Sequence, residues 1–295
     1  MRVLVTGGTG FVGRAVVGAL QERGHTVRVL SRGTRSVPPG AEGLAGSVLK
    51  PDSLPGALNG CEAVVHLVGI ISEVGDQTYE RVHVDGTRNV VKAARAGGVG
   101  RFVHMSALGT RPEARSRYHR SKWAAEEAVR SSGLTWTLLR PGLIYGPGDG
   151  FVNRFAGMIR RSPVLPVVGP GTCRLQPVAV EDVARCVAGA LEIQESVGRT
   201  LDLCGRESLT LNAILSEILR AMGRSRVRVH LPWSLANAQA RMLEWVFPSL
   251  LGKAPPLNRD QILMLQEDNI GDPEPACRLF DFEPVPFPAG LRRWL

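Results

Sequence analysis

The stretch MRVLVTGGTGFVGRAVVGAL, residues 1–20, decides the fold class of this 295-residue chain. A β-branched apolar run over Val3–Val5 is followed by Gly7, Gly10 and Gly13 and then by helical spacing. A strand that turns through glycines into a helix leaves free N–H groups where the helix dipole favours a pyrophosphate. No Lys-Ser/Thr pair follows, which argues against a P-loop nucleotidase. The stretch predicts a nucleotide-binding turn, with a bare structural turn as the alternative.

Short apolar runs alternate with helical patterns over about the first 140 residues. The predicted strands are 3–5, 27–30, 63–67, 102–105 and 135–139, and the predicted helices are 9–23, 79–96 and 122–131. This alternation is typical of a Rossmann-type doubly wound parallel sheet in the α/β class. We expect a Rossmann domain over 1–225, in which insertions after 141 contribute to a substrate lobe, and a smaller C-terminal substrate or partner lobe over 226–295.

Composition excludes several classes of protein. The chain is 44% hydrophobic and holds five scattered cysteines, which favours a buried core without a disulfide framework or a metal site. The net charge is +9, but the arginines are spread along the chain, so no nucleic-acid partner is expected. Because the first residues lead straight into the glycine turn without a signal-peptide core, we expect a cytoplasmic protein.

An apolar segment stands out near the C-terminus. Trp233 to Leu251 contains few charges and is bounded by Pro232 on one side, with Pro248 near its end. It is interpreted as a helix packed on the main domain, a lid, a membrane-surface helix or a partner contact. The alternatives leave room for a location at a membrane surface.

Tyr118 and Lys122 have the spacing Tyr-x-x-x-Lys. Four residues apart on a helix, the phenol and the ammonium group lie on one face, where the cation is expected to lower the tyrosine pKa towards neutrality. Such a tyrosine can act as a general acid or base beside a hydride carrier. A surface pair at a helix start is the alternative.

Several motifs together resemble a known superfamily. TGGTGFVG, VDGTRNVVKAA, RFVHMSALG, YHRSK and LRPGLIYGPGD occur in the order found in extended or atypical short-chain dehydrogenase/reductases. SRYHRSK and PPLNRDQILMLQEDNI are most similar to bacterial relatives of the NAD(P)-binding accessory subunit of respiratory complex I. The resemblance implies NAD(P) binding and a role in quinone metabolism or respiratory-complex assembly.

The resemblance also implies roles for individual residues. Tyr118 would be the general acid or base, Lys122 would hold the nicotinamide ribose, and Ser106 is the candidate third partner. The expected cofactor-binding set is Gly7, Thr9, Gly10, Phe11, Val12, Gly13, Arg14, Ser31, Arg32, Arg35, Leu67, Val68, Gly69, His83, Lys122, Pro141 and Gly142.

The chain departs from the superfamily pattern at two positions that matter. Ala107 stands at the usual Ser/Thr site, and Ser106 precedes it by one residue. Because a strand alternates faces, Ser106 can substitute only if the backbone bends there. His83 stands where many relatives carry an asparagine.

Charge indicates which dinucleotide is preferred. NAD-specific Rossmann folds place an acid at the end of the second strand, whereas a nearby arginine suits the extra phosphate of NADP. Here the second strand leads into Ser31, Arg32 and Arg35, without an acid, and Arg14 follows the glycines. We therefore expect NADP(H) to be preferred and NAD(H) to be the alternative.

The sequence leaves three functions open. The leading one is an NAD(P)H-dependent oxidoreductase acting on a carbonyl or quinone-like small molecule. The second is a non-catalytic NADPH-binding accessory or assembly factor, associated with a membrane or a respiratory complex. The third is a nucleotide-sugar epimerase or dehydratase, against which Ser31 and Arg32 count. A homodimer is also expected from the superfamily.

Overall fold

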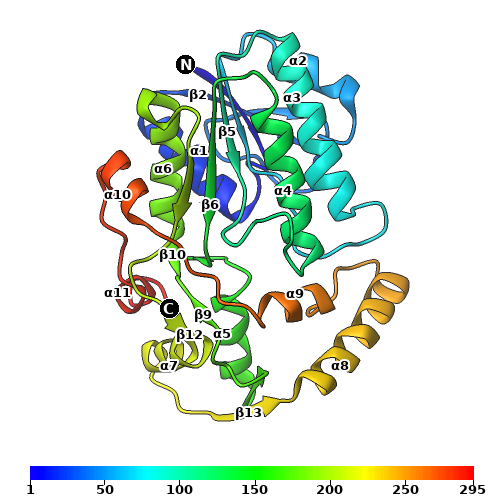
Figure 1. The fold of residues 1–295 in the computed structure, drawn as a ribbon, viewed down its shortest axis with the longest axis vertical. Helices are drawn as coiled ribbons and strands as arrows, with labels where there is room; N and C mark the ends of the chain where they lie inside the picture. Colours follow the sequence, from blue (N-terminus) through cyan, green and yellow to red (C-terminus); the bar gives the residue numbers. More distant parts are fainter.

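A seven-stranded parallel sheet forms the centre of the upper part of the molecule (Figure 1). The computed structural model describes residues 1–295, and the strand order is β11-β6-β5-β4-β1-β2-β3. These strands are β1 Arg2–Thr6, β2 Thr26–Ser31, β3 Glu42–Ala45, β4 Ala63–His66, β5 Arg101–Met105, β6 Trp136–Pro141 and β11 Thr200–Leu203. From β1 the chain adds β2 and β3 on one side and then β4, β5 and β6 on the other side. Such sheets bind dinucleotides at this switch point, between β1 and β4. The expected Rossmann fold is confirmed.

Helices cover both faces of the sheet. One face carries α1 Phe11–Glu22, α6 Val180–Glu192 and α10 Glu274–Phe280. The other carries α2 Leu54–Leu58, α3 Gly86–Ala96 and α4 Arg117–Arg130, with the short helices η1 Pro51–Ser53 and η2 Glu80–Asp85 beside them. The central strands are buried on both sides, so they consist of nearly continuous apolar runs instead of alternating ones.

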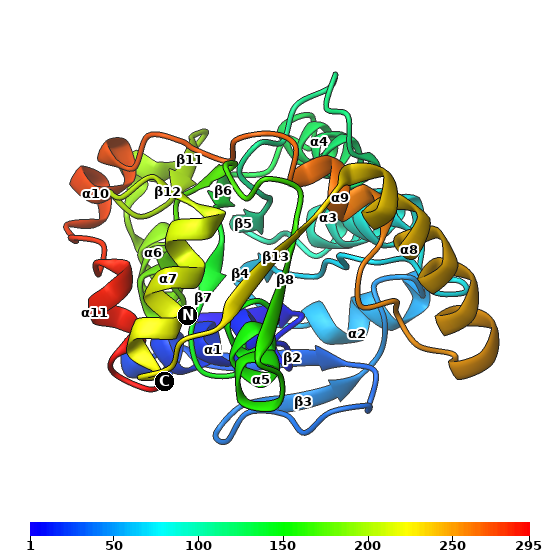
Figure 2. The same cartoon turned by 90° about the horizontal axis from the view of Figure 1, so that it is seen from below.

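A lower lobe lies beyond the carboxyl ends of the strands (Figures 1 and 2). It contains the helices α5 Val152–Arg161, α7 Leu211–Ala221, α8 Trp233–Val246, η4 Phe247–Leu251, α9 Arg259–Met264 and α11 Phe287–Leu291. Its strands form three small sheets, β7 Ile144–Tyr145 with β10 Val178–Ala179, β9 Arg174–Leu175 with β12 Leu209–Thr210, and β8 Val164–Val168 with β13 Val227–Leu231.

The lower lobe is assembled from several parts of the chain. β13, just past residue 225, pairs with β8 in parallel, and the two strands cross the view from below in Figure 2. The chain then returns to the upper part, where Phe280 of α10 packs in the same core cluster as Leu201 of β11. The insertions after residue 141 therefore build the lobe together with the C-terminal segment.

The predicted elements of the first 140 residues are all present, with shifts of a few residues. The principal difference is that α4 begins at Arg117, five residues before its predicted start, because Ser116 caps it by accepting the N–H of His119 at 3.2 Å. Both Tyr118 and Lys122 therefore lie within one helix. None of the helices has the length and apolar character that crossing a bilayer requires.

Candidate functional site

The glycine turn after β1 opens directly onto the first helix. Gly7 has φ of +81°, a backbone conformation that favours glycine, and a Cβ at Gly13 would lie 2.1 Å from the Gly7 carbonyl oxygen. Gly10 is the N-cap residue of α1, and no side chain caps the helix there. The N–H groups of the first turn therefore remain available for an anion. This glycine cradle, in which a Cβ at Gly13 would clash with the backbone of the turn, fits a dinucleotide pyrophosphate.

The predicted residues after β4 border the same cradle. A Cβ at Gly7 would lie 3.1 Å from both Leu67 C and Val68 N, so the two turns touch through their backbones. Gly69 follows, and a Cβ there would lie 3.6 Å from the His83 Nε2 atom. The ends of β1 and β4 and the His83 side chain are thus brought together at one edge of the sheet.

His83 links this edge to the helix that carries Tyr118. Its Nε2 accepts a hydrogen bond from the Ile70 N–H at 3.0 Å, so its Nδ1–H donates to Ser121 Oγ at 2.8 Å. Ser121 Oγ in turn donates to the Tyr118 carbonyl at 2.7 Å. Burial lowers the pKa of His83 to about 2, which keeps the imidazole neutral and able to accept.

Tyr118 lies in an aromatic cluster. Its ring centroid is 5.4 Å from that of His83, 5.9 Å from Tyr79 and 5.1 Å from His119, with steep angles between the rings. Burial raises the pKa of Tyr118 to about 12, because the charged phenolate loses hydration. The expected lowering of this pKa towards neutrality is therefore wrong for this arrangement, and the phenol stays protonated.

The direction of the Lys122 side chain explains why Lys122 does not lower the pKa of Tyr118. Its Nζ donates to the Met105 carbonyl at 2.7 Å, at the end of β5, instead of to the Tyr118 hydroxyl. Burial lowers the pKa of Lys122 to about 8. Both groups lie at the sheet edge that holds the glycine cradle, but no hydrogen bond joins them.

Ser106 does not reach Tyr118. Its N–H donates to the Leu139 carbonyl at 2.7 Å, and the Leu108 N–H donates to the Pro141 carbonyl at 2.8 Å, so extended pairing continues past β5. The backbone bend that a substituting serine requires is absent. Ser106 Oγ lies 3.4 Å from Thr110 Oγ1, and Ser106 is not positioned as the third partner in this arrangement.

A buried ion pair fixes α4 against β6. Glu126 is fully buried and accepts two hydrogen bonds from Arg140, at 2.8 and 2.6 Å, and one from Arg130 at 2.7 Å. Burial alone would raise the pKa of Glu126, but the hydrogen bonds from Arg140 and the charges of Arg140 and Arg130 lower it overall. The ion pair holds α4 in place one turn beyond Lys122.

A segment near the C-terminus, which the sequence did not indicate as part of the site, contacts α4 and the loop after β5. We call residues Asn258–Gly271 the C-terminal strap. The Asp260 carboxylate accepts the N–H groups of Arg117 and Tyr118 at 2.7 and 2.9 Å, which caps α4 a second time. The Asn258 side chain donates to the Ile71 carbonyl at 3.0 Å. The signal that could have found Asp260 is the NRDQ capping pattern at the start of α9, although nothing local indicates the contact with α4.

Further along, the strap contacts the loop after β5 and the lower lobe. Glu267 pairs with Arg111 at 2.6 Å, and the Asn269 side chain donates to the Leu108 carbonyl at 2.8 Å. The Gly271 N–H donates to Gln176 Oε1 at 2.6 Å. The strap therefore connects α4 and the loop after β5 to the lower lobe.

Basic side chains gather at the end of β2. Arg14 Nη2 donates to the Ser36 carbonyl at 2.6 Å, which places this guanidinium on the segment that follows β2. Arg32 donates to the Gln77 side chain at 3.0 Å, and Arg35 is exposed. Ser31 is buried, and its Oγ accepts the Gly33 N–H at 3.1 Å. No carboxylate belongs to residues 31–36.

The remaining predicted cofactor contacts lie on the same edge. Thr9, Phe11 and Val12 belong to the glycine turn and the first turn of α1. Pro141 is the last residue of β6, and the Gly142 N–H donates to the Leu203 carbonyl at 2.9 Å. No group of three or more His, Cys, Asp or Glu side chains is arranged to hold a metal ion.

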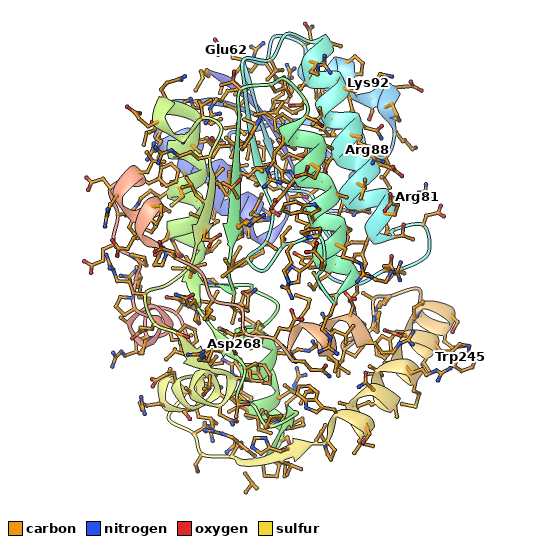
Figure 3. All side chains as sticks on the ribbon, in the orientation of Figure 1. Glu62, Arg81, Arg88, Lys92, Trp245 and Asp268 are labelled. Carbon is orange, nitrogen blue, oxygen red and sulfur yellow. The ribbon has the colours of Figure 1, made fainter.

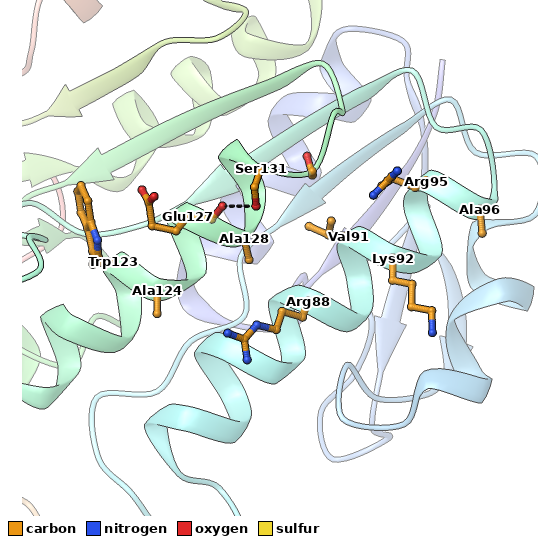
Figure 4. A pocket seen from close by; sticks show the side chains of 11 residues that line it. Arg88, Val91, Lys92, Arg95, Ala96, Trp123, Ala124, Glu127, Ala128 and Ser131 are labelled. Atoms are coloured by element: carbon orange, nitrogen blue, oxygen red, sulfur yellow. Dashed lines mark hydrogen bonds between the residues drawn. The ribbon is translucent and has the colours of Figure 1, made fainter.

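A separate groove of about 960 Å³ lies between α3 and α4 (Figure 4). Val91, Ala124 and Ala128 form part of its floor, and Arg88 and Glu127 are among its polar lining residues. None of the predicted site residues lines it, so it is distinct from the nucleotide cradle.

Fold and site define an NAD(P)-binding Rossmann protein of the extended or atypical short-chain dehydrogenase/reductase class. Residues 3–204 match the NAD dependent epimerase/dehydratase family, and the chain belongs to this family.

Two curated proteins and one solved structure show the range of relatives. The chain is 31% identical, over 96% of its length and 73% of the relative, to NADH dehydrogenase [ubiquinone] 1 alpha subcomplex subunit 9 of Arabidopsis thaliana. It is 30% identical, over 99% and 98%, to 2-alkyl-3-oxoalkanoate reductase of Stenotrophomonas maltophilia. The structure of UDP-glucose 4-epimerase from Thermotoga maritima shares the fold, with a TM-score of 0.78, 21% identity and coverage of 99% and 96%.

Proposed function

We propose that the protein is an NADPH-dependent reductase of a carbonyl or quinone-like small molecule. One observation carries the proposal: Tyr118, held protonated by burial, lies at the edge of the sheet that carries the glycine cradle. A phenol that keeps its proton is suited to donate it to an oxygen that gains negative charge. This protonation state matches the reductive direction, whereas the reverse oxidation would use the ionised phenol as a base.

The reaction divides into two transfers. A nicotinamide held at the glycine cradle would supply the hydride for the substrate carbon. Tyr118 donates its proton to the carbonyl oxygen, so that C=O would become CH–OH while NADPH would become NADP⁺. Lys122, whose pKa near 8 leaves it mainly protonated at neutral pH, would hold the nicotinamide ribose from its position beside the Met105 carbonyl. His83 positions Tyr118 through Ser121.

We assign the preference for NADPH to Arg14, Arg32 and Arg35. A guanidinium matches the 2′-phosphate of NADP in geometry and charge, and no acid near the end of β2 repels it. Arg14 and Arg32 come from different elements, α1 and the segment after β2, which allows them to approach a phosphate from two sides.

A second function, that of a non-catalytic NADPH-binding accessory factor, is favoured by a specific observation. Ala107 replaces the usual hydroxyl side chain, and Ser106 Oγ is directed to Thr110 instead of Tyr118. The resemblance to a complex I subunit supports association with a respiratory complex or a membrane surface.

For the oligomer we propose a homodimer through the groove between α3 and α4 (Figure 4).

NADPH oxidation by the wild type and by Tyr118→Phe, measured against a panel of carbonyl compounds and quinones, tests the proposed reaction. A direct binding measurement with NADPH accompanies it. Turnover that falls by about 10²-fold or more in the variant, with NADPH affinity retained, supports the reductase. Tight NADPH binding without turnover in either protein would favour the accessory function. Full turnover in Tyr118→Phe would exclude the assigned role.

A further inference from the structure

The apolar surface of α8 and η4 is exposed to solvent. Of the residues in these two helices, only Ala236 and Ala240 are buried. Trp245 is 70% exposed and Leu250 is 71% exposed, and Leu235, Met242 and Leu251 are also exposed. Trp245 points outward from α8 at the side of the lower lobe (Figure 3). Single exposed apolar residues are common, but a cluster of this size on one element marks an interaction surface.

The adjoining strand pair extends this surface. Val227 and Val229 of β13 and Val164 of β8 are exposed, and β13 leads through Pro232 directly into α8. In the view from below, β13 crosses the middle of the molecule and α8 lies at its side (Figure 2). We call α8, η4 and β13 the apolar ledge. Most of the large exposed apolar side chains of the chain belong to it or to β8 beside it.

Positive charge surrounds the apolar ledge. Within residues 224–259 the cations are Arg224, Arg226, Arg228, Arg241, Lys253 and Arg259, and the only carboxylate is Glu244. Glu244 is already paired with Arg259 at 2.7 Å, so Arg241 and Lys253 have no anionic partner within the chain. Basic residues beside exposed Trp and Leu are typical of helices that lie in the interface of an anionic bilayer.

The apolar ledge is attached to the site by the C-terminal strap. Ala236 and Ala240 of α8 pack on Ile262 of α9. Two residues before Ile262, Asp260 caps the helix that carries Tyr118. Ile71 and Ile270, two further exposed apolar residues, lie beside and within the strap. Exposed apolar side chains therefore flank the strap at both of its ends.

We propose that the apolar ledge docks on the surface of an anionic lipid bilayer, from which an apolar substrate enters the site past the strap. The helices are too short to cross a bilayer, which fits a helix lying in the plane of the interface. Entry of a substrate from the bilayer rests on the proposed reductase function. Docking on the bilayer does not require turnover.

Flotation of the full-length protein with vesicles tests the docking. The vesicles consist of phosphatidylcholine alone or of an equimolar mixture with phosphatidylglycerol. The wild type is expected to float with the mixed vesicles and to dissociate as salt increases. The triple variant Met242→Ser/Trp245→Ser/Leu250→Ser is expected to lose about tenfold in partitioning, and Arg241→Ser to lose several-fold. Arg185→Ser, an exposed arginine on α6, is the matched control and should float like the wild type.

Three results would overturn the proposal: no flotation with either vesicle, equal flotation of the triple variant, or a dimer in sedimentation velocity that the triple variant dissociates without vesicle binding. The last would assign the ledge to a second copy of the chain. NADPH oxidation with a water-soluble carbonyl compound, measured in parallel, should be unchanged in the triple variant. Failure of the reductase would appear only in that assay, and failure of docking only in flotation.

Discussion

The Asp260 carboxylate accepts the backbone N–H of Tyr118 at 2.9 Å, although 142 residues separate them in the sequence. It also accepts the N–H of Arg117, so two of the free donors at the start of α4 depend on a side chain from the C-terminal strap. The position of the proposed catalytic tyrosine is therefore determined in part by the far end of the chain.

Asp260→Ala should loosen the start of α4. We expect a loss of about 1 kcal/mol in the free energy of unfolding, as for other helix caps, together with a lower kcat. Asp260→Asn retains an oxygen that can accept and should restore most of both. Asp76→Ala, whose side chain is 86% exposed, is the control in urea unfolding. Equal effects of the alanine and asparagine variants would contradict the capping role.

Lys122 should make stability depend on pH. Burial lowers its pKa from 10.5 to about 8, so between these values the unfolded chain binds more protons and stability rises with pH. Relative to Lys122→Met, the wild type should gain about 2 kcal/mol between pH 7.5 and 9.5. Urea unfolding at both pH values checks this. A difference that stays constant would show that Lys122 titrates normally.

Tyr118 should remain protonated throughout the same range, because burial raises its pKa to about 12. Ionisation of Tyr118 should therefore not lower the rate of reduction near pH 10. The rate should instead fall above pH 8, because Lys122 loses its charge there. The pH profile of kcat/KM for the wild type measures this. A profile rising with a pKa near 7 would mean that the tyrosine acts from its ionised form.

Gly13→Ala should abolish the cradle. The added Cβ would lie 2.1 Å from the Gly7 carbonyl oxygen, so the turn must shift, and we expect NADPH affinity to fall by about tenfold or more. Gly18→Ala is the matched control within the same helix, since nothing lies within 4 Å of its Cβ. It should leave binding unchanged and raise stability by about 0.5–1 kcal/mol. Unchanged NADPH binding in Gly13→Ala would show that the dinucleotide binds elsewhere.

Arg32→Ala and Arg35→Ala should reduce selectivity for NADPH. Each guanidinium that contacts the 2′-phosphate should contribute about tenfold, so the Kd of NADPH should rise while that of NADH changes little. Arg95→Ala, on α3, controls for the change in net charge. A parallel rise in both Kd values would assign these arginines to a structural role.

The sequence predicted those parts of the site that lie within one local pattern. The glycine turn, the strands that flank it and the Tyr118–Lys122 spacing depend on neighbours in the chain, and the fold contains all of them. β3 was missed because its EGLA sequence includes glycine and lies exposed at the sheet edge. The short β11, with its TLDL sequence, lacks a longer apolar run.

Other features could not be predicted because they arise from packing. The pKa of Tyr118 depends on burial among Tyr79, His83 and His119 and on the direction that Lys122 takes towards Met105. The contact of Asp260 with α4 joins segments whose proximity no local periodicity encodes. Local motifs identified the chemistry, while its electrostatics required the assembled structure.

Deuterium transfer from NADPH tests the central claim most directly. NADPH with both hydrogens at nicotinamide C4 replaced by deuterium is incubated with the wild type and with a carbonyl compound that supports NADPH oxidation, and the product is analysed by mass spectrometry. We predict an alcohol one mass unit heavier, formed far more slowly by Tyr118→Phe. A product without deuterium, or equal labelling rates in both proteins, would contradict hydride transfer assisted by Tyr118.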